Sequence, residues 1–264
     1  MKDHQLEYQK RLREHSSMKA IQILSAISYG DRYSTITEIC AVTGLSVSTV
    51  HRILQELVEC DFVVKDETQK RYRAGIEAWS FSMKLKQTDY LREATREEMT
   101  RLNDLSRETI HLIAVEGEQG VYVAKLGAKN SIGLQSQVGR RLPLFCSGGG
   151  KALLAWQSPQ WMETYLKRVP LERFTERTIT TQKELLKELE VIRVRGYALD
   201  NREHHNDIIC VAAPIFDSNG DAVCSIGISA PDYRFSLDDA ISYAGEVVKS
   251  AKRVTDRLCG VVTG

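Results

Sequence analysis

A short segment near the N-terminus, residues 46 to 60, most constrains how this chain can fold. Its aliphatic residues recur at the spacing i, i+3, i+4 and i+7, which places them on one face of a helix. These positions are Val50, Ile53, Leu54 and Leu57. Ser46 precedes the pattern and can cap the helix by accepting a backbone N–H of its first turn. The segment is therefore predicted to be an amphipathic helix with one buried face.

The residues just upstream predict a second helix and a tight turn. Thr35 and Glu38 have the spacing of a capping box, and Gly44 can adopt the left-handed conformation that ends a helix. The predicted buried positions of this helix are Ile36, Ile39 and Val42. Two short helices joined by a glycine-containing turn form a helix-turn-helix, whose second helix can enter the major groove of DNA.

The polar face of the second helix carries small or forked side chains that can donate hydrogen bonds to phosphates and base edges. The predicted DNA contacts on this face are Ser46, Ser48, Thr49, His51, Arg52 and Gln55. An ordinary helical hairpin with a solvated outer face is the alternative, because any amphipathic helix needs a polar side. The helix pair alone leaves both interpretations open.

A basic hairpin after this helix favours DNA binding. Residues 62–64 and 72–74 predict two short strands around a polar turn, and such a wing contacts the DNA backbone beside the groove. The predicted phosphate contacts on the wing are Lys70, Arg71 and Arg73. A further helix is predicted from the apolar stripe formed by Met18, Ile21, Leu24 and Ile27. Three helices and a wing thus fit within residues 17–75, as a winged helix-turn-helix.

The pattern of the remaining chain predicts a second domain. A length of 264 residues suggests two domains, and we expect a charged arm over residues 1–16 and a linker helix over 76–89. From residue 90 to 264, short strands and helices follow one another, with a strong turn signal at 217–220. The expected fold class is α+β, an antiparallel sheet surrounded by helices. A third strand is expected at 131–138 and a short helix at 152–156.

Composition excludes several classes of protein. The chain has 36 basic and 35 acidic residues, so its net charge of +1 argues against a nonspecific nucleic-acid coat, and any DNA affinity must come from locally focused charge. No apolar run is long enough for a membrane helix. The six cysteines are scattered without a CxxC pair or zinc-type spacing. We therefore expect a cytoplasmic protein with reduced thiols, no membrane contact, no metal and no cofactor.

The run from Cys146 to Lys151, CSGGGK, is a candidate anion site. It is not a phosphate-binding P-loop, because Phe145 and Ala152 occupy the positions where that motif needs a glycine and a hydroxyl residue. What remains is a glycine-lined entry into a helix, with Ser147 as the expected cap and free backbone N–H groups that would suit a carboxylate. The alternative is that the glycines serve only tight packing.

The segment 203–207, EHHND, contains residue types that bind metals. Consecutive residues rarely converge on one ion, so a solvated loop at the mouth of a pocket is favoured over a metal site. Asp200 and Glu203 could act as paired acids, but nothing marks a substrate cleft. No nucleophile with a neighbouring base is apparent, and no catalytic residue is assigned.

Nearly the whole chain, from residue 17 to 258, resembles the IclR-type bacterial transcriptional regulators. The most specific match is a C-terminal signature, present here as Gly196, Asp200, Glu203, Cys210-Val211-Ala212 and Ile215-Phe216-Asp217. Residues 45–54, 139–143 and 147–151 are also typical of that family. Residues 108–112 and 176–180 are most similar to its branch of sugar-acid regulators, which includes the 2-keto-3-deoxygluconate repressor.

The resemblance implies a winged helix-turn-helix joined by a linker helix to a GAF-like α+β effector-binding domain. It also implies dimers or tetramers on a palindromic operator of double-stranded DNA, and a small carboxylate or sugar-acid effector. The implied effector-binding residues are Leu142, Cys146, Ser147, Gly148, Gly149, Asp200, Glu203, Ile208, Cys210, Gly227 and Ser229. Gly227, Asp207 and Ile209 depart from the usual family pattern, which leaves the effector's identity open.

The expected function is that of an effector-responsive repressor or activator of a carbohydrate or sugar-acid catabolic operon, without catalytic activity. Two alternatives remain. One is a small-molecule enzyme that depends on Asp200 or Cys210. The other is a protein-interaction adaptor, which would show none of the salt-dependent affinity that phosphate contacts confer.

Overall fold

The computed structural model describes residues 16–28, 34–66, 68, 70–84, 89–129 and 136–260. The chain divides into two compact units, an N-terminal unit up to residue 87 and a C-terminal unit from residue 88. The charged arm expected at residues 1–16 lies outside the described residues, except for Ser16 at the start of α2. Each unit is described separately below.

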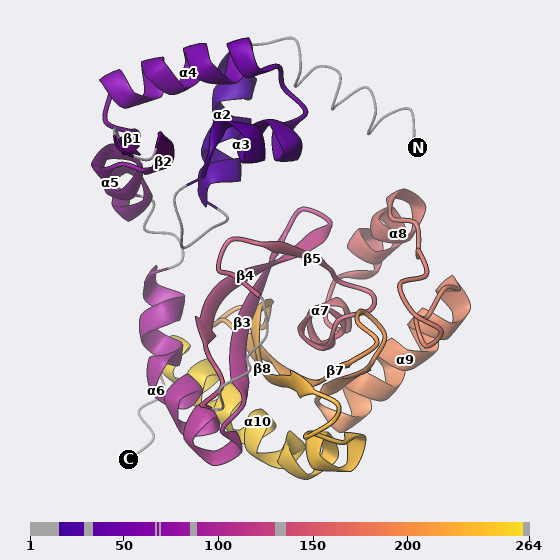
Figure 1. Cartoon of the computed structure of the whole chain (residues 1–264). Coiled ribbons are helices and arrows are strands. Elements are labelled where there is room, and N and C mark those ends of the chain that lie inside the picture. The colour runs from indigo at the N-terminus through magenta and orange to yellow at the C-terminus, as the bar shows by residue number, and fades with distance from the viewer. Residues whose placement is uncertain are drawn as a thin grey trace. The chain divides into compact units, whose positions relative to one another are not determined.

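In the described part of the N-terminal unit, three of the helices pack around one small core (Figure 1). They are α2 (Ser16–Ser28), α3 (Ile36–Thr43) and α4 (Val47–Glu59). The core is formed by aliphatic residues of all three helices: Ile23, Ile27, Ile39, Val50, Ile53 and Leu54. The amphipathic helix predicted at 46–60 is confirmed, because all four of its predicted apolar positions are buried.

The predicted helix ends are also present. Thr35 and Glu38 form a capping box at the start of α3, and Gly44 ends that helix with φ 68°. The Ser46 hydroxyl accepts the backbone N–H of Thr49 at 3.4 Å and so caps α4. These local contacts explain why two helices separated by only three residues start and stop where they do.

Two apolar positions predicted to be buried are exposed. Ile21 is 54% exposed, because the buried stripe of α2 runs through Ile23 and Ile27 instead. Val42 is 68% exposed, because it lies on the last turn of α3, beyond the face that packs on α4. Both positions satisfied a helical spacing, but a spacing alone does not say which of two overlapping stripes meets the core.

The wing follows α4 as the hairpin of β1 (Val63–Asp66) and β2 (Arg71–Ala74). The two strands pair antiparallel, with Asp66 opposite Arg71, and Ser34 forms a further antiparallel bridge to Tyr72. Tyr72 is buried against the helical core, so the hairpin is attached to the helices rather than extended into solvent. Helix α5 (Ile76–Lys84) ends the described part of this unit.

The C-terminal unit is built on a six-stranded antiparallel sheet in the order β5-β4-β3-β8-β7-β6. Its strands are β3 (Thr109–Glu116), β4 (Gln119–Leu126), β5 (Arg141–Pro143), β6 (Ala198–Asn201), β7 (Ile208–Phe216) and β8 (Ala222–Pro231). The predicted α+β class with an antiparallel sheet is confirmed. The third strand expected at 131–138 lies mainly outside the described residues, and the edge strand here is β5.

Helices cover both faces of this sheet (Figure 1). On one face lie α6 (Asp89–Ser106) and α10 (Leu237–Leu258), and on the other α7 (Gly148–Leu154), with α8 (Pro159–Arg168) and α9 (Gln182–Arg195) packed around it. The strands alternate between these faces. In β8, for example, Ile226 and Ile228 join the core under α10, whereas Gly227 and Ser229 face the α7 side. Among the described residues, no helix is both long and apolar enough to cross a membrane.

Helix α7 begins earlier than the sequence predicted. It starts at Gly148 rather than Ala152, so the three glycines form its first turn. Gly148 and Gly149 lie against strand residues, and Gly150 lies against the backbone of Leu144. A Cβ on Gly149 would lie 2.5 Å from Cδ1 of Ile113, and one on Gly150 would lie 2.4 Å from the carbonyl oxygen of Leu144. Glycine's low helix propensity concealed this turn, and the close contact with the sheet compensates for it.

A glycine in the central strand provides a test of this packing. A Cβ on Gly227 would lie 2.6 Å from the carbonyl oxygen of Val211, which is backbone and cannot move aside. Gly227→Ala is therefore expected to lower the free energy of unfolding by about 1–3 kcal/mol. Gly245→Ala, in α10 with nothing within 4 Å of the added Cβ, is the matched control and should stabilise by about 0.5–1 kcal/mol. Urea unfolding of both variants would contradict this if the two changes had the same sign.

Candidate functional site

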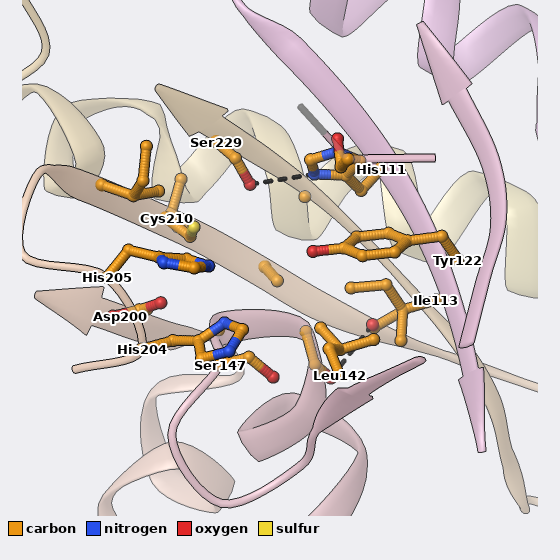
Figure 2. A pocket seen from close by; sticks show the side chains of 18 of the residues that line it. His111, Ile113, Tyr122, Leu142, Ser147, Asp200, His204, His205, Cys210 and Ser229 are labelled. Atoms are coloured by element: carbon orange, nitrogen blue, oxygen red, sulfur yellow. Dashed lines mark hydrogen bonds between the residues drawn. The ribbon is translucent and has the colours of Figure 1, made fainter. Parts of the chain in front are cut away.

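A cavity of about 610 Å³ lies in the C-terminal unit, on the face of the sheet that carries α7 (Figure 2). Side chains from β3, β4, β6, β7 and β8 meet there with the first turn of α7. In Figure 2 the rings of His111 and Tyr122 stand on one side, and Asp200, His204 and His205 on the other. The cavity is large enough for a small organic molecule.

The β3–β4 side of the cavity is polar but uncharged. The ring of His111 is buried and joins two hydroxyl groups, with Nδ1 3.1 Å from Oγ of Ser229 and Nε2 2.6 Å from Oγ of Ser136. Burial lowers the pKa of His111 to about 3, and the nearby charge of Lys125 acts in the same direction. The ring of Tyr122 lies 4.7 Å from that of His111, and burial raises its pKa. Both rings are therefore neutral at physiological pH and can only exchange hydrogen bonds with a ligand.

The opposite side contains a buried carboxyl group. Asp200 is 2% exposed and accepts the backbone N–H of Glu203 at 2.7 Å. Its pKa is raised to about 7, because burial disfavours the carboxylate and the charge of Glu203 repels it, while Lys151 and the backbone donors act in the opposite direction. Asp200 can therefore take up or release a proton far closer to neutral pH than an exposed aspartate can. Its neighbour Cys210 has a pKa well above the usual range, mainly through burial, so its thiol is protonated.

The mouth of the cavity carries the charged and exposed groups. Arg140 and Arg141 line it, and both are exposed. The ring of His204 lies 4.1 Å from that of His205 and 5.2 Å from Phe174, and burial lowers its pKa to about 4. Two arginines outnumber the one exposed acid, Asp207, in this part of the lining, and inside lie hydrogen-bonding groups such as His111 and Tyr122. This arrangement suits a small anion that also carries hydroxyl or carbonyl groups.

Two residues predicted to bind a ligand do not line the cavity. Glu203 is turned beneath α7, where its carboxylate meets the buried ammonium group of Lys151 at 2.5 Å. Cys146 is fully buried in the core formed with α8 and α9. The signature residue Glu203 therefore has a structural task, joining α7 to the loop after β6, and a buried lysine needs such a partner.

Ser147 lies at the cavity but does not cap α7 with its side chain. Its hydroxyl donates to the carbonyl oxygen of Pro143 at 2.7 Å, which leaves the first backbone N–H groups of the helix without a side-chain cap. The other predicted residues that line the cavity are Leu142, Gly148, Gly149, Asp200, Ile208, Cys210, Gly227 and Ser229. Nine of the eleven residues predicted to bind an effector thus line one cavity, and they come from five separate segments of the chain.

Sequence reasoning missed the residues on the β3–β4 side. They are His111, Ile113, Tyr122 and Ser136, and the two arginines of the mouth, Arg140 and Arg141, were missed as well. One signal was available: His111 is a polar residue within an otherwise apolar strand, which places it on the face opposite the α10 core. Arg140 and Arg141 lie in segment 139–143, which is typical of the family described above, and no comparable signal marked Ile113, Tyr122 or Ser136. Within the described ranges, no group of three or more His, Cys, Asp or Glu side chains could hold a metal ion.

The predicted DNA contacts lie on the surface of the N-terminal unit, on α4 and on the wing. Ser46, Ser48, His51, Arg52 and Gln55 are exposed on α4, and Thr49 is half-buried beside them. Lys70, Arg71 and Arg73 are exposed on the wing. One feature was not anticipated, since the guanidinium of Arg52 pairs with the carboxylate of Glu56 at 2.5 Å and so places an acid at the edge of this face.

Comparison with known proteins decides the family. The family model described as "Bacterial transcriptional regulator IclR C-terminal" matches residues 83–256, and that of the IclR helix-turn-helix domain matches residues 16–67. The chain belongs to the IclR family. This confirms the resemblance based on the signature residues, and it makes the protein a bacterial transcriptional regulator with a helix-turn-helix domain and a C-terminal effector-binding domain.

Individual IclR-family proteins are similar over most of the chain. The regulator KdgR of Dickeya chrysanthemi is 33% identical over 244 residues, which cover 92% of this chain and 79% of KdgR. KdgR belongs to the branch that residues 108–112 and 176–180 resemble. The crystal structure of Thermotoga maritima IclR has a TM-score of 0.75 at 32% identity, covering 91% of this chain and 97% of that one. An IclR homologue from Microbacterium hydrocarbonoxydans, complexed with 4-hydroxybenzoate, shares the fold, with a TM-score of 0.80 at 20% identity and coverage of 93% and 100%.

The buried carboxyl group predicts a pH dependence of stability. Because the pKa of Asp200 is raised from 3.8 to about 7, the folded protein holds a proton that the unfolded chain releases. The resulting stabilisation is fully present below pH 3.8 and is lost as pH rises through 7, by at most about 1.4 kcal/mol per pH unit. His111 and His204 act with the opposite sign, so the quantity to compare is the difference between the wild type and Asp200→Asn. Urea unfolding at several pH values should show this difference changing between pH 4 and 7 and constant above 8; a flat difference would contradict the assignment.

Proposed function

We propose that this IclR-family regulator binds operator DNA through α4 and the wing, and that a small carboxylate in the cavity of the C-terminal unit changes this binding. The observation that carries the proposal is the cavity itself, with two arginines at its mouth and neutral hydroxyl and imidazole groups inside. A sugar acid fits this arrangement, because its carboxylate suits the arginines and the free N–H groups of α7, and its hydroxyls suit His111, Tyr122 and Ser229. The similarity to KdgR agrees with this class of effector.

On the DNA side, we propose that the helix-turn-helix places the N-terminal part of α4 in the major groove. The groups proposed to contact base edges or phosphates are Ser46, Ser48, Thr49, His51, Arg52 and Gln55 on α4, and Lys70, Arg71 and Arg73 on the wing. Since the net charge is only +1, two copies of the unit on a palindromic operator would supply the affinity that one lacks. A dimer or a pair of dimers is therefore part of the proposal. For the effector to change operator binding, its binding free energy must differ by about 1–3 kcal/mol between two placements of the DNA-binding units.

The state of the cavity's titratable groups argues against an enzyme. A nucleophilic cysteine needs a lowered pKa, and that of Cys210 is raised. A general acid or base works best with a pKa near the working pH, and that of His111 is about 3. Asp200 has a pKa of about 7, but the thiol of the neighbouring Cys210 is protonated and is therefore a poor nucleophile. We infer that the cavity binds its ligand without transforming it.

Fluorescence anisotropy tests the function directly. The purified chain would be titrated against the DNA upstream of its own gene and against random duplex, at several salt concentrations, with and without a panel of sugar acids and small keto acids. We expect tight, salt-sensitive binding to the upstream DNA that one acid shifts. Failure to bind even random DNA at low salt would favour the adaptor or enzyme alternatives.

The Arg52–Glu56 pair predicts two changes of opposite sign. Arg52→Ala should weaken operator binding by about tenfold, because a guanidinium contact with a base edge or phosphate is lost. Glu56→Gln should strengthen it, because an acid beside the DNA surface is removed and Arg52 is released. The measurement is the same titration at several salt concentrations, with the oligomeric state checked by sedimentation. If neither variant alters the binding constant at any salt concentration, the recognition face has been misplaced.

Variants of the cavity mouth test the effector site separately. Arg140→Ala is expected to weaken the effect of the active acid by about tenfold, because one charge-assisted hydrogen bond is worth roughly 1.5–3 kcal/mol. Lys167→Ala is the matched control, since Lys167 lies on α8 outside the cavity and pairs with Glu163. Both variants should bind operator DNA normally when no acid is present. Equal sensitivity of the two variants to the acid would place the effector elsewhere.

A further inference from the structure

The recognition helix α4 exposes one aliphatic side chain that its packing does not use. Val50, Ile53, Leu54 and Leu57 are buried in the core of the N-terminal unit, and none is more than 8% exposed. Val47, the first residue of the helix, is 61% exposed. A branched apolar group is thus exposed to water on a helix whose other apolar positions are buried or half-buried.

Val47 stands among the groups proposed to face the major groove. It lies between the cap Ser46 and Ser48, both exposed, and His51 follows it by four residues and so lies on the same side of the helix. In helix-turn-helix proteins the N-terminal residues of the recognition helix contact base edges, while the preceding helix crosses the backbone. An exposed residue at the first position of α4 is therefore expected to lie next to the base edges.

The chemistry of valine limits what it can recognise there. Its side chain neither donates nor accepts hydrogen bonds, so it cannot bind a phosphate or the polar edge of a base. Among the groups that base pairs present in the major groove, the 5-methyl of thymine is the apolar one. We propose that Val47 is a specificity-determining residue that recognises a thymine in each operator half-site by packing against its 5-methyl group. The inference rests on the proposed DNA binding by α4.

Val42 provides an internal comparison. It is 68% exposed and equally apolar, but it lies at the end of α3, the helix that precedes the recognition helix. Val42 is expected to lie beside the DNA backbone, where no methyl group is available to it. If both valines were exposed because a second protein surface covers them, the two would behave alike.

Replacing thymine by deoxyuridine in the operator removes only the methyl group and keeps the base pair. The full-length protein would first be used to select its preferred sequence from a random duplex library, and each thymine of that sequence would then be replaced in turn. We expect wild type to bind about three- to fivefold more weakly at one thymine per half-site, the effect of exposing roughly one buried methyl. Val47→Ala should bind the thymine and deoxyuridine duplexes equally at that position, whereas Val42→Ala should keep the full loss.

Several outcomes would overturn the proposal. They are the absence of any thymine whose methyl matters, an undiminished loss in Val47→Ala, and an equal loss of discrimination in Val42→Ala. A change in the sedimentation of Val47→Ala would instead show that the valine packs against protein.

If selection enriches no sequence at all, the proposed DNA-binding function fails together with this inference. If a sequence is enriched but no thymine responds, only the role of Val47 fails. Thermal melting of each variant would show that its fold is intact.

Discussion

The close contact of α7 with the sheet is the constraint on which the C-terminal unit depends. Three consecutive glycines let this helix lie where any side chain would collide with Ile113 or with the carbonyl of Leu144. The helix packs on that sheet face and leaves a cavity beside its first turn, which is lined by side chains of the neighbouring strands. Tight packing and an open ligand site are therefore both consequences of the three glycines. From the sequence alone, the two were alternative explanations of the glycine run.

Buried charge is arranged so that the cavity itself stays nearly neutral. Lys151 is satisfied by Glu203 beneath the helix, and together they hold the loop that carries His204 and His205 at the mouth. Burial keeps His111 uncharged and raises the pKa of Asp200 to about 7. A ligand entering past Arg140 thus meets hydrogen-bonding groups and one carboxyl that can take up a proton, rather than a fixed negative charge.

The N-terminal unit is organised by local signals to an unusual degree. Its two caps, the left-handed Gly44 and the spacing of α4 are encoded within 25 residues, and its core consists of the aliphatic side chains that these signals align. What those signals do not settle is which apolar residues are left over. Val42 satisfies the helical spacing of α3, and Val47 is the first residue of α4. Both are nevertheless exposed, because three short helices can bury only the faces on which they contact one another.

The sequence by itself determined the fold class, the caps of α3 and α4, and, through the family resemblance, nine of the residues that line the cavity. It could do so because capping, turn chemistry and period-two or period-3.6 patterns act within a few residues, and the family signature marks positions in the chain. Only the tertiary structure decided that Glu203 supports Lys151 instead of facing the ligand, and that His111, Tyr122 and Arg140 belong to the site. Those facts depend on which strands are neighbours and on the close contact between α7 and the sheet, and both are set by packing between residues far apart in the chain.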